Sequence, residues 1–288
     1  MRAPAGVCFA VVLSVGAKAA EIRGEGLCSM STVNLGSDGR EKFPEVAGKA
    51  DIWECGRSTG KEKPLVVVVT GAAANTMRGN YTALARSLAV QGSVVAVVDR
   101  FDLDKAPYNL ASPLTVERAI DAAGVKGEVY LWGHSLGAQV VLATLAGTCG
   151  DFCSEPADVT TNPKRSIGYG VSPPPAGISN AGKAFLAFDG ANDSLDQGGT
   201  FTLSTIPALK EGAVAIEAND LEHMSPVDGP YTRVGDTPSS APWPFQMHRV
   251  VAISSAFFEA PDDNDDICSL LDDADPRGSF SFCLVISQ

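Results

Sequence analysis

One pentapeptide, Gly133-His134-Ser135-Leu136-Gly137, constrains this chain more than any other stretch of its sequence. An apolar run over residues 128–132 precedes it, and a helical pattern from Leu136 to Thr148 follows it. A serine between two glycines, at the turn from a strand into a helix, is typical of a nucleophile elbow. Side chains beside such a serine would clash with the neighbouring strands, and the two glycines remove those clashes. The pentapeptide therefore predicts a strained turn that exposes the oxygen of Ser135.

Apolar runs alternate with helical patterns over most of the chain. Runs that are apolar throughout are typical of strands buried on both faces of a parallel sheet. Repeated units of strand and helix predict a doubly wound sheet. The predicted fold class is therefore α/β, a mostly parallel sheet flanked by helices, with antiparallel edge strands near residues 45–57. The predicted strands span residues 65–69, 94–98, 129–132, 166–171, 184–188 and 213–218, and the predicted helices span residues 81–89, 116–123, 136–148, 204–210 and 247–258.

The start of the chain has the pattern of a secretory signal. Arg2 is the basic start, Val7 to Val15 is a short apolar core, and Ala17-Lys18-Ala19 is an A-x-A cleavage site. An organelle transit peptide is the alternative, but such peptides are richer in arginine and serine. We expect residues 1–19 to be a signal peptide of a secreted protein. Residues 20–288 should form a single α/β domain that ends in an acidic segment with cysteines.

Cysteine usage agrees with export, because disulfides persist in oxidising compartments. The chain has 7 cysteines, of which Cys8 lies in the predicted signal. The other cysteines allow fifteen pairings. None of them adjoins a histidine or forms a C-x-x-C pair, so a zinc site is not expected. Locality favours the pairs Cys28–Cys55, Cys149–Cys153 and Cys268–Cys283.

The chain is acidic, with a formal net charge of −12 over 288 residues. A phosphate backbone needs patches of lysine and arginine, so this charge argues against nucleic-acid binding. No later apolar run is long enough to span a bilayer. The run from Asp262 to Asp266 could bind calcium, but it lacks the EF-hand spacing. We interpret the whole stretch from Asp262 to Asp275 as a solvated acidic loop.

A serine nucleophile needs a base, and the base needs a carboxylate to orient it. On this type of fold the chain order is serine, acid, histidine. Of the 3 histidines, His134 adjoins Ser135, and its side chain should point away from the serine. His223 follows the strand at 213–218 after a short loop, where ligand sites of open parallel sheets form. His248 lies in the closing helix, so we favour His223 as the base.

The acid should follow the preceding strand, where Asp189 and Asp193 are both available. Asp189 comes directly after the predicted strand and could cap a turn. Asp193 lies three residues beyond Gly190, where the loop can curl back toward the histidine. We therefore favour Asp193. Asp220 and Glu222 are too close to His223 in sequence to be its expected partners.

A developing oxyanion needs two backbone donors. The N–H of Leu136 follows the nucleophile and lies at a helix N-terminus, where the helix dipole favours negative charge. The second donor should come from the small-residue loop Thr70-Gly71-Ala72-Ala73-Ala74, which follows the strand at 65–69. Ala72 is our choice for that donor.

Together these motifs make the chain resemble the α/β-hydrolases over about residues 45 to 260. The elbow pentapeptide, the G-x-x-D loop that ends at Asp193, and a histidine after the last parallel strand carry the resemblance. Within that superfamily the chain is similar to cutinase-like polyester hydrolases, dienelactone hydrolases and chlorophyllases. Many relatives carry His-Gly after the first buried strand, where this chain has Thr70-Gly71.

The resemblance implies a role for each candidate residue. Ser135 would be the nucleophile, Asp193 the acid and His223 the base. Ala72 and Leu136 would supply the oxyanion hole. The activity implied is that of a serine esterase, lipase or cutinase, which cleaves carboxylic esters.

The spacing of the predicted strands indicates an open site. Only residues 172–183 separate two predicted strands where many lipases insert a helical cap, so no large cap domain is expected. An open serine suits bulky or polymeric esters. Residues 228–244 are rich in proline, glycine and serine, and either line the cleft or form a surface loop.

We therefore expect a secreted, monomeric serine esterase that needs no metal or organic cofactor. A chlorophyllase-like hydrolase of a pigment ester is the enzymatic alternative, and acyl transfer to an alcohol would use the same residues. A non-catalytic α/β-hydrolase scaffold is the alternative from a different class. Such scaffolds usually lack one of the three catalytic residues, and this chain has candidates for all of them.

Overall fold

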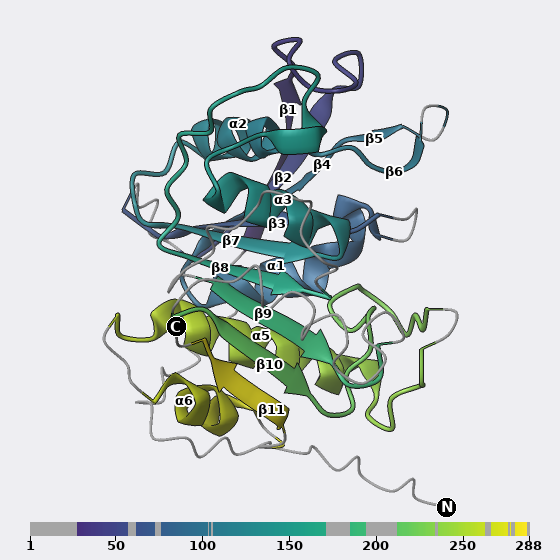
Figure 1. Cartoon of the computed structure of the whole chain (residues 1–288), viewed down its shortest axis with the longest axis vertical. Coiled ribbons are helices and arrows are strands. Elements are labelled where there is room, and N and C mark those ends of the chain that lie inside the picture. Colours follow the sequence, from purple (N-terminus) through teal and green to yellow (C-terminus); the bar gives the residue numbers. More distant parts are fainter. Residues whose placement is uncertain are drawn as a thin grey trace, which may run out of the picture.

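Nine strands form one central sheet in the computed structural model of the chain (Figure 1). The structure describes residues 28–56, 62–72, 76–102, 104, 106–170, 185–193, 212–233, 236–262, 266–275, 277 and 280–286, and only the backbone of residues 106–108. The strands are β1 (Cys28–Gly36), β2 (Gly48–Cys55), β3 (Leu65–Val69), β4 (Val94–Asp99), β7 (Val129–His134), β8 (Arg165–Tyr169), β9 (Phe185–Gly190), β10 (Val214–Ala218) and β11 (Phe280–Val285).

The sheet is parallel in its centre and antiparallel at both edges. The strand order is β1-β2-β4-β3-β7-β8-β9-β10-β11. Neighbours from β4 to β10 pair in parallel. At the edges, β1 and β2 pair antiparallel, as do β2 with β4 and β10 with β11. Two shorter strands, β5 (Phe101–Asp102) and β6 (Ala106–Asn109), form a separate hairpin.

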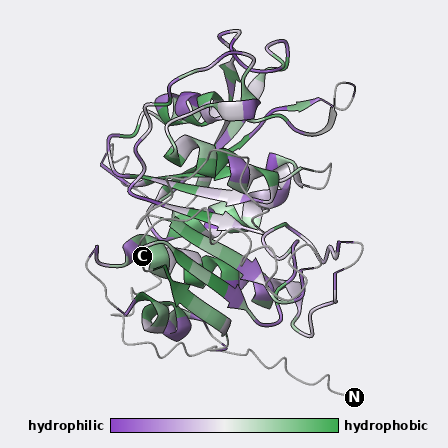
Figure 2. Cartoon of the chain, viewed as in Figure 1, coloured by the Kyte–Doolittle hydropathy of each residue, from purple (hydrophilic) through white to green (hydrophobic). Residues whose placement is uncertain are grey.

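Helices cover both faces of the sheet because its inner strands are apolar on both sides. Alternate residues of β3 show the division: Val66 and Val68 belong to one hydrophobic cluster, whereas Val67 and Val69 belong to the other. Figure 2 shows hydrophobic residues gathered on β9 and β10. The first face packs against α1 (Thr82–Val90), α5 (Trp243–Glu259) and α6 (Ile267–Ala274), and the second packs against α2 (Pro113–Ala123) and α3 (Leu136–Leu145).

The predicted α/β class with a mostly parallel sheet is confirmed, and several predicted boundaries shift. Helix α2 begins at Pro113 instead of residue 116, because Ser112 accepts a hydrogen bond from Thr115 N and starts the helix with a capping box. Helix α3 ends at Leu145 instead of Thr148. Strand β9 continues to Gly190, so Asp189 lies inside the strand and not directly after it.

Three elements differ more from the prediction. The stretch expected to be an acidic loop contains α6, whose N-cap Asp266 accepts a hydrogen bond from Ser269 N. The edge strands β1 and β11 were not predicted. Most residues of β1 are exposed and form no apolar run, whereas β11 has a short apolar run, residues 282–285, that the prediction left within the cysteine-bearing C-terminal segment. An antiparallel strand near residues 45–57 was predicted, and β2 occupies that place.

Disulfides hold both edges of the sheet. Cys28 of β1 is bonded to Cys55 of β2, and Cys268 of α6 to Cys283 of β11, with S–S distances of 2.04 and 2.02 Å. A third disulfide joins Cys149 and Cys153. The pairing follows the local order of the cysteines along the chain.

Some predictions fall outside the described residues. These are the signal at residues 1–19, the short connection at 172–183, the helix at 204–210 and the middle of the Asp262–Asp266 run. In the part of the chain that the structure describes, no helix has the length and apolar character needed to cross a membrane.

Candidate active site

The predicted elbow lies at the carboxyl end of β7, where Ser135 is the residue that precedes α3. Ser135 has φ 53° and ψ −118°, a backbone conformation that side-chain-bearing residues rarely adopt. A Cβ at position 137 would lie 2.2 Å from the carbonyl oxygen of Val69, and one at position 133 would lie 2.5 Å from Gly137 O. Both positions therefore require glycine, and the tight turn that the pentapeptide predicts is present.

The predicted acid and base meet beside this turn. Asp193 Oδ2 lies 2.6 Å from His223 Nδ1, and the side chains are 0% and 5% exposed. Since an ionised carboxylate only accepts hydrogen bonds, Nδ1 carries the proton that it shares with Asp193. In a neutral imidazole the other ring nitrogen, Nε2, then carries no proton and can accept one. This is the tautomer that a general base requires.

Tight backbone turns bring Asp193 to the histidine. Asp193 N donates to Gly190 O at 2.9 Å, and Asn192 N donates to Leu221 O at 2.9 Å, so the loop after β9 lies against the loop after β10. A Cβ on Gly190 would lie 2.3 Å from Leu221 O. Gly190, the glycine of the G-x-x-D loop, therefore packs directly against the backbone of Leu221, two residues before His223.

One strand end connects Ser135 with His223. Ser135 N donates to Tyr169 O at 2.8 Å, which places the elbow beside the last residue of β8. The next residue, Gly170, faces the histidine ring: a Cβ there would lie 2.7 Å from both Nδ1 and Cε1 of His223. The serine and the histidine thus flank the same two residues of β8 and its following turn. Sequence analysis missed Gly170, although a glycine directly after a buried strand is a usable signal.

We expect Gly170→Ala to lower kcat about 100-fold while the protein stays folded, because the new methyl group must displace the His223 ring. Gly124→Ala is the matched control, since Gly124 has φ 62° and Gly170 has φ 61°, but Gly124 has no neighbour within 4 Å of the added carbon. Each variant should lose about 1 kcal/mol of unfolding free energy from the left-handed backbone. Steady-state kinetics and thermal melts separate the two effects. Equal kcat values for the two variants would contradict the contact.

Further contacts hold the loop that carries His223. Tyr169 Oη donates to Glu222 O at 2.7 Å, and Glu222 N donates to Ser225 Oγ at 2.8 Å. Ser225 Oγ in turn donates to Gln246 Oε1 of α5 at 2.6 Å. The carboxylates near His223 in sequence bind elsewhere, as predicted: Glu222 accepts from Ser239 N, and Asp220 accepts from Ser240 N.

His134 plays a larger part than the sequence indicates. Its ring is fully buried, and its centroid lies 4.7 Å from that of the His223 ring. Burial, together with the neighbouring His223, holds the pKa of His134 well below its ordinary value, so the ring is neutral at neutral pH. The sequence gives no signal for the contacts that this ring makes.

The start of the loop after β3 lies against the elbow, because a Cβ at position 137 would lie 2.6 Å from Thr70 O. Asn109 Nδ2 donates to both Thr70 O and Thr70 Oγ1 at 2.9 Å, which fixes the end of the strand. Gly71 N already donates to Tyr81 Oη at 3.0 Å. A donor from this loop must therefore come from Ala72 or later, and Ala72 is exposed. Residues 73–75 lie outside the described part of the chain.

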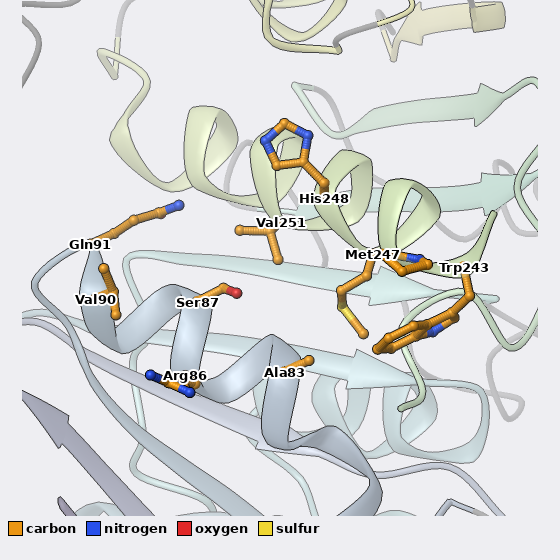
Figure 3. Close-up of a pocket in the computed structure, with 10 residues that line it drawn as sticks. Ala83, Arg86, Ser87, Val90, Gln91, Trp243, Met247, His248 and Val251 are labelled. Carbon is orange, nitrogen blue, oxygen red and sulfur yellow. The ribbon is translucent and has the colours of Figure 1, made fainter. Parts of the chain in front are cut away.

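His248, one of the two histidines not favoured as the base, is exposed on α5. It lines a groove of about 480 Å³ between α1 and α5, and none of the predicted catalytic residues lines that groove. Figure 3 shows Trp243 and Met247 of α5 reaching toward α1 in this groove.

A smaller cavity adjoins the elbow. Its volume is about 160 Å³, and Leu136, the residue after Ser135, forms part of its wall. The apolar side chains of Phe43, Leu110 and Phe152 line it further. Lys42 and Asp151 contribute charged groups. The cavity can hold a small apolar group beside Leu136, and Ser135 itself is not among the residues that line it.

Comparison with known proteins finds similarity in structure only. No family model matches the chain, and no curated protein matches its sequence. The chain is similar to a ferulic acid esterase from Streptomyces cinnamoneus, with a TM-score of 0.55 and 15% identity over 85% of this chain and 91% of that one.

Two other solved structures are similar at lower scores. An esterase domain of a Rhodothermus marinus protein has a TM-score of 0.45 and 14% identity, over 68% of this chain and 90% of that one. The thermophilic esterase Est2 of Thermogutta terrifontis has a TM-score of 0.46 and 13% identity, over 69% of this chain and 85% of that one. The sheet order, the flanking helices and the first of these likenesses show that the chain has the α/β-hydrolase fold.

Proposed function

We propose that the protein is a secreted serine hydrolase that cleaves carboxylic esters. The observation that carries this proposal is the buried pair of Asp193 and His223, 2.6 Å apart, beside the strained Ser135. A carboxylate, an imidazole in the correct tautomer and a serine hydroxyl at an elbow are the parts that acyl transfer through serine requires. A ferulic acid esterase is among the solved structures that share the fold over most of both chains.

The reaction would proceed in two halves. Ser135 Oγ attacks the ester carbonyl while His223 Nε2 takes the hydroxyl proton, and Asp193 stabilises the resulting imidazolium. The tetrahedral oxyanion accepts hydrogen bonds from the backbone N–H groups of Leu136 and Ala72. The C–O bond to the alcohol then breaks, and His223 returns the proton to the leaving oxygen. In the second half, water gives a proton to His223 Nε2 and attacks the acyl carbonyl. The C–O bond to Ser135 Oγ breaks, the acid leaves, and His223 returns the proton to Oγ.

The cavity beside Leu136 limits one part of the substrate. An engineered cavity of about 150 Å³ in another protein holds a benzene molecule. The cavity of about 160 Å³ would therefore accept a short acyl chain or one aromatic ring. The rest of the ester, which can be bulky or polymeric, would extend from the open side of the site.

Secretion fits the cysteine chemistry. Disulfides persist outside the cell and in oxidising compartments, and the described residues hold three of them. With the predicted signal peptide, we propose that the enzyme acts outside the cell, as a monomer and without a cofactor.

A series of p-nitrophenyl esters from acetate to palmitate, with benzoate, tests the proposal. We expect hydrolysis of the short and benzoyl esters and a steep loss of kcat/KM beyond about six carbons, because longer chains exceed the cavity. A fluorophosphonate probe should label Ser135, as identified by mass spectrometry. No hydrolysis of any ester, together with no label, would favour the non-catalytic scaffold. Cleavage confined to a chlorophyll ester would favour the pigment hydrolase.

A further inference from the structure

A chain of hydrogen bonds joins the loop after β3 to the backbone of His223 through two buried side chains. Gly71 N lies 3.0 Å from Tyr81 Oη, and Tyr81 Oη lies 2.6 Å from His134 Nδ1. His134 Nε2 lies 2.9 Å from His223 O. Tyr81 and His134 are both 0% exposed, so no solvent competes for these bonds.

Chemistry fixes the direction of every bond in the chain. A backbone carbonyl only accepts, so His134 Nε2 carries a proton and donates to His223 O. In a neutral imidazole, Nδ1 is then an acceptor, so the hydroxyl of Tyr81 donates to it. The hydroxyl oxygen remains free to accept from Gly71 N. Burial raises the pKa of the Tyr81 hydroxyl, so this hydroxyl keeps its proton. Burial lowers the pKa of His134, so its ring stays neutral and carries a single proton.

This chain of hydrogen bonds connects the three places on which the proposed chemistry depends. Gly71 directly precedes Ala72, the proposed loop donor to the oxyanion. His134 directly precedes Ser135, and His223 is the proposed base. Displacing any of these groups by about 1 Å can cost about 100-fold in rate. These hydrogen bonds thus fix the positions of the donor loop, the elbow and the base relative to one another.

A further contact closes this network into a ring. Asp228 lies shortly after His223 in the chain, and its carboxylate oxygens accept from Thr82 N at 2.8 Å and Ala83 N at 3.0 Å. Those two N–H groups follow Tyr81 directly, at the start of α1. The loop of His223 is therefore attached to the Tyr81 segment twice, once through the side chain of His134 and once through the carboxylate of Asp228.

We propose that Tyr81 and His134 are positioning residues that couple the oxyanion loop to the general base through this directed chain. The inference rests on the proposed ester hydrolysis. Neither residue touches the substrate in this scheme. His134 also keeps the neighbourhood of His223 free of positive charge, so the imidazolium that forms during catalysis meets a neutral ring 4.7 Å away.

Variants of the two residues separate positioning from packing. Tyr81→Phe keeps the ring and removes one donor and one acceptor, so we expect kcat to fall about 30-fold with KM within about threefold. His134→Phe breaks both of its bonds and should lower kcat about 100-fold. His134→Gln can place an amide N–H near His223 O, and should recover at least a third of the activity that His134→Phe loses.

Ser254→Ala is the matched control. It removes the acceptor of Trp132 Nε1, a buried bond of 3.1 Å on the same strand as His134 that leads to α5 and not to the site. We expect a similar loss of melting temperature and an unchanged kcat. If Tyr81→Phe and Ser254→Ala show the same kcat, or if His134→Gln recovers nothing, the positioning role is wrong.

A spectroscopic measurement tests the hydrogen-bonded chain without relying on enzymatic activity. In ¹⁵N spectra of the histidine rings, the signal that disappears in His134→Gln should show the Nε2–H tautomer and should not titrate between pH 8 and pH 5. A titrating ring, or an Nδ1–H tautomer, would overturn the inference even in an active enzyme. If His134 shows the expected tautomer but the protein hydrolyses no ester, the proposed function is wrong. The catalytic role of the hydrogen-bonded chain is then wrong as well.

Discussion

Replacing Ser135 with alanine should lower kcat for ester hydrolysis on the order of 10⁵-fold, because no other group can form the acyl-enzyme. Residues that act as a unit are not additive, so His223→Ala in the Ser135→Ala background should cost little more than either change alone. Steady-state kinetics of the two single variants and the double variant measure this directly.

The same position also offers a test of backbone strain. Glycine adopts φ 53° without the steric cost that alanine has there, so Ser135→Gly should be equally inactive yet about 1 kcal/mol more stable than Ser135→Ala. Denaturant unfolding compares the two. Activity that survives either change would contradict the mechanism, and equal stabilities would contradict the strain at the elbow.

Replacing Asp193 with asparagine should lower kcat about 10⁴-fold with a small change in KM. An asparagine amide donates a hydrogen bond to His223 Nδ1, which moves the ring proton to Nε2. The nitrogen that must take the serine proton is then already protonated. The change keeps the size of the side chain, so the loss reports on the tautomer and not on packing.

Asp189→Asn is the matched control for that substitution. Asp189 is also fully buried, but it lies inside β9 beside Glu217 of β10. We expect it to alter the unfolding free energy more than kcat. The assignment of the acid would be wrong if Asp189→Asn lost more kcat than Asp193→Asn, since both variants make the same chemical change.

The centre of the sheet could be predicted from the sequence because its signal is local and strong. Residues 65–69 and 94–98 are apolar on both faces, which few structures other than buried parallel strands allow. The elbow and the order of serine, acid and histidine are also visible, since each follows a recognisable strand. The place of Asp193 beyond Gly190 favours it over Asp189. Gly190 lets the loop pack against Leu221, and Asp193 then reaches His223.

The parts that were missed depend on contacts between distant residues. Strands β1 and β11 are half-exposed, and their pairing with β2 and β10 cannot be recognised from their own composition. Helix α6 lies in an acidic stretch, and it is helical because Ile267 and Leu271 are buried against the core while its carboxylates face outward. Tyr81 and His134 are 53 positions apart, so no local pattern links them.

The two disulfides at the edges of the sheet affect how many substitutions this protein can tolerate. Crosslinks that close chain segments of 27 and 15 residues each stabilise the fold by about 3 to 4 kcal/mol through the lost freedom of the unfolded chain. They join β1 to β2 and α6 to β11, at the two edges of the sheet, whereas Ser135 follows β7, the central strand of the nine. Most substitutions around an active site cost stability, and a fold with covalent support elsewhere tolerates more of them. The architecture thereby lets the walls of the cavity beside Leu136 accept substitutions while the edges keep the molecule folded.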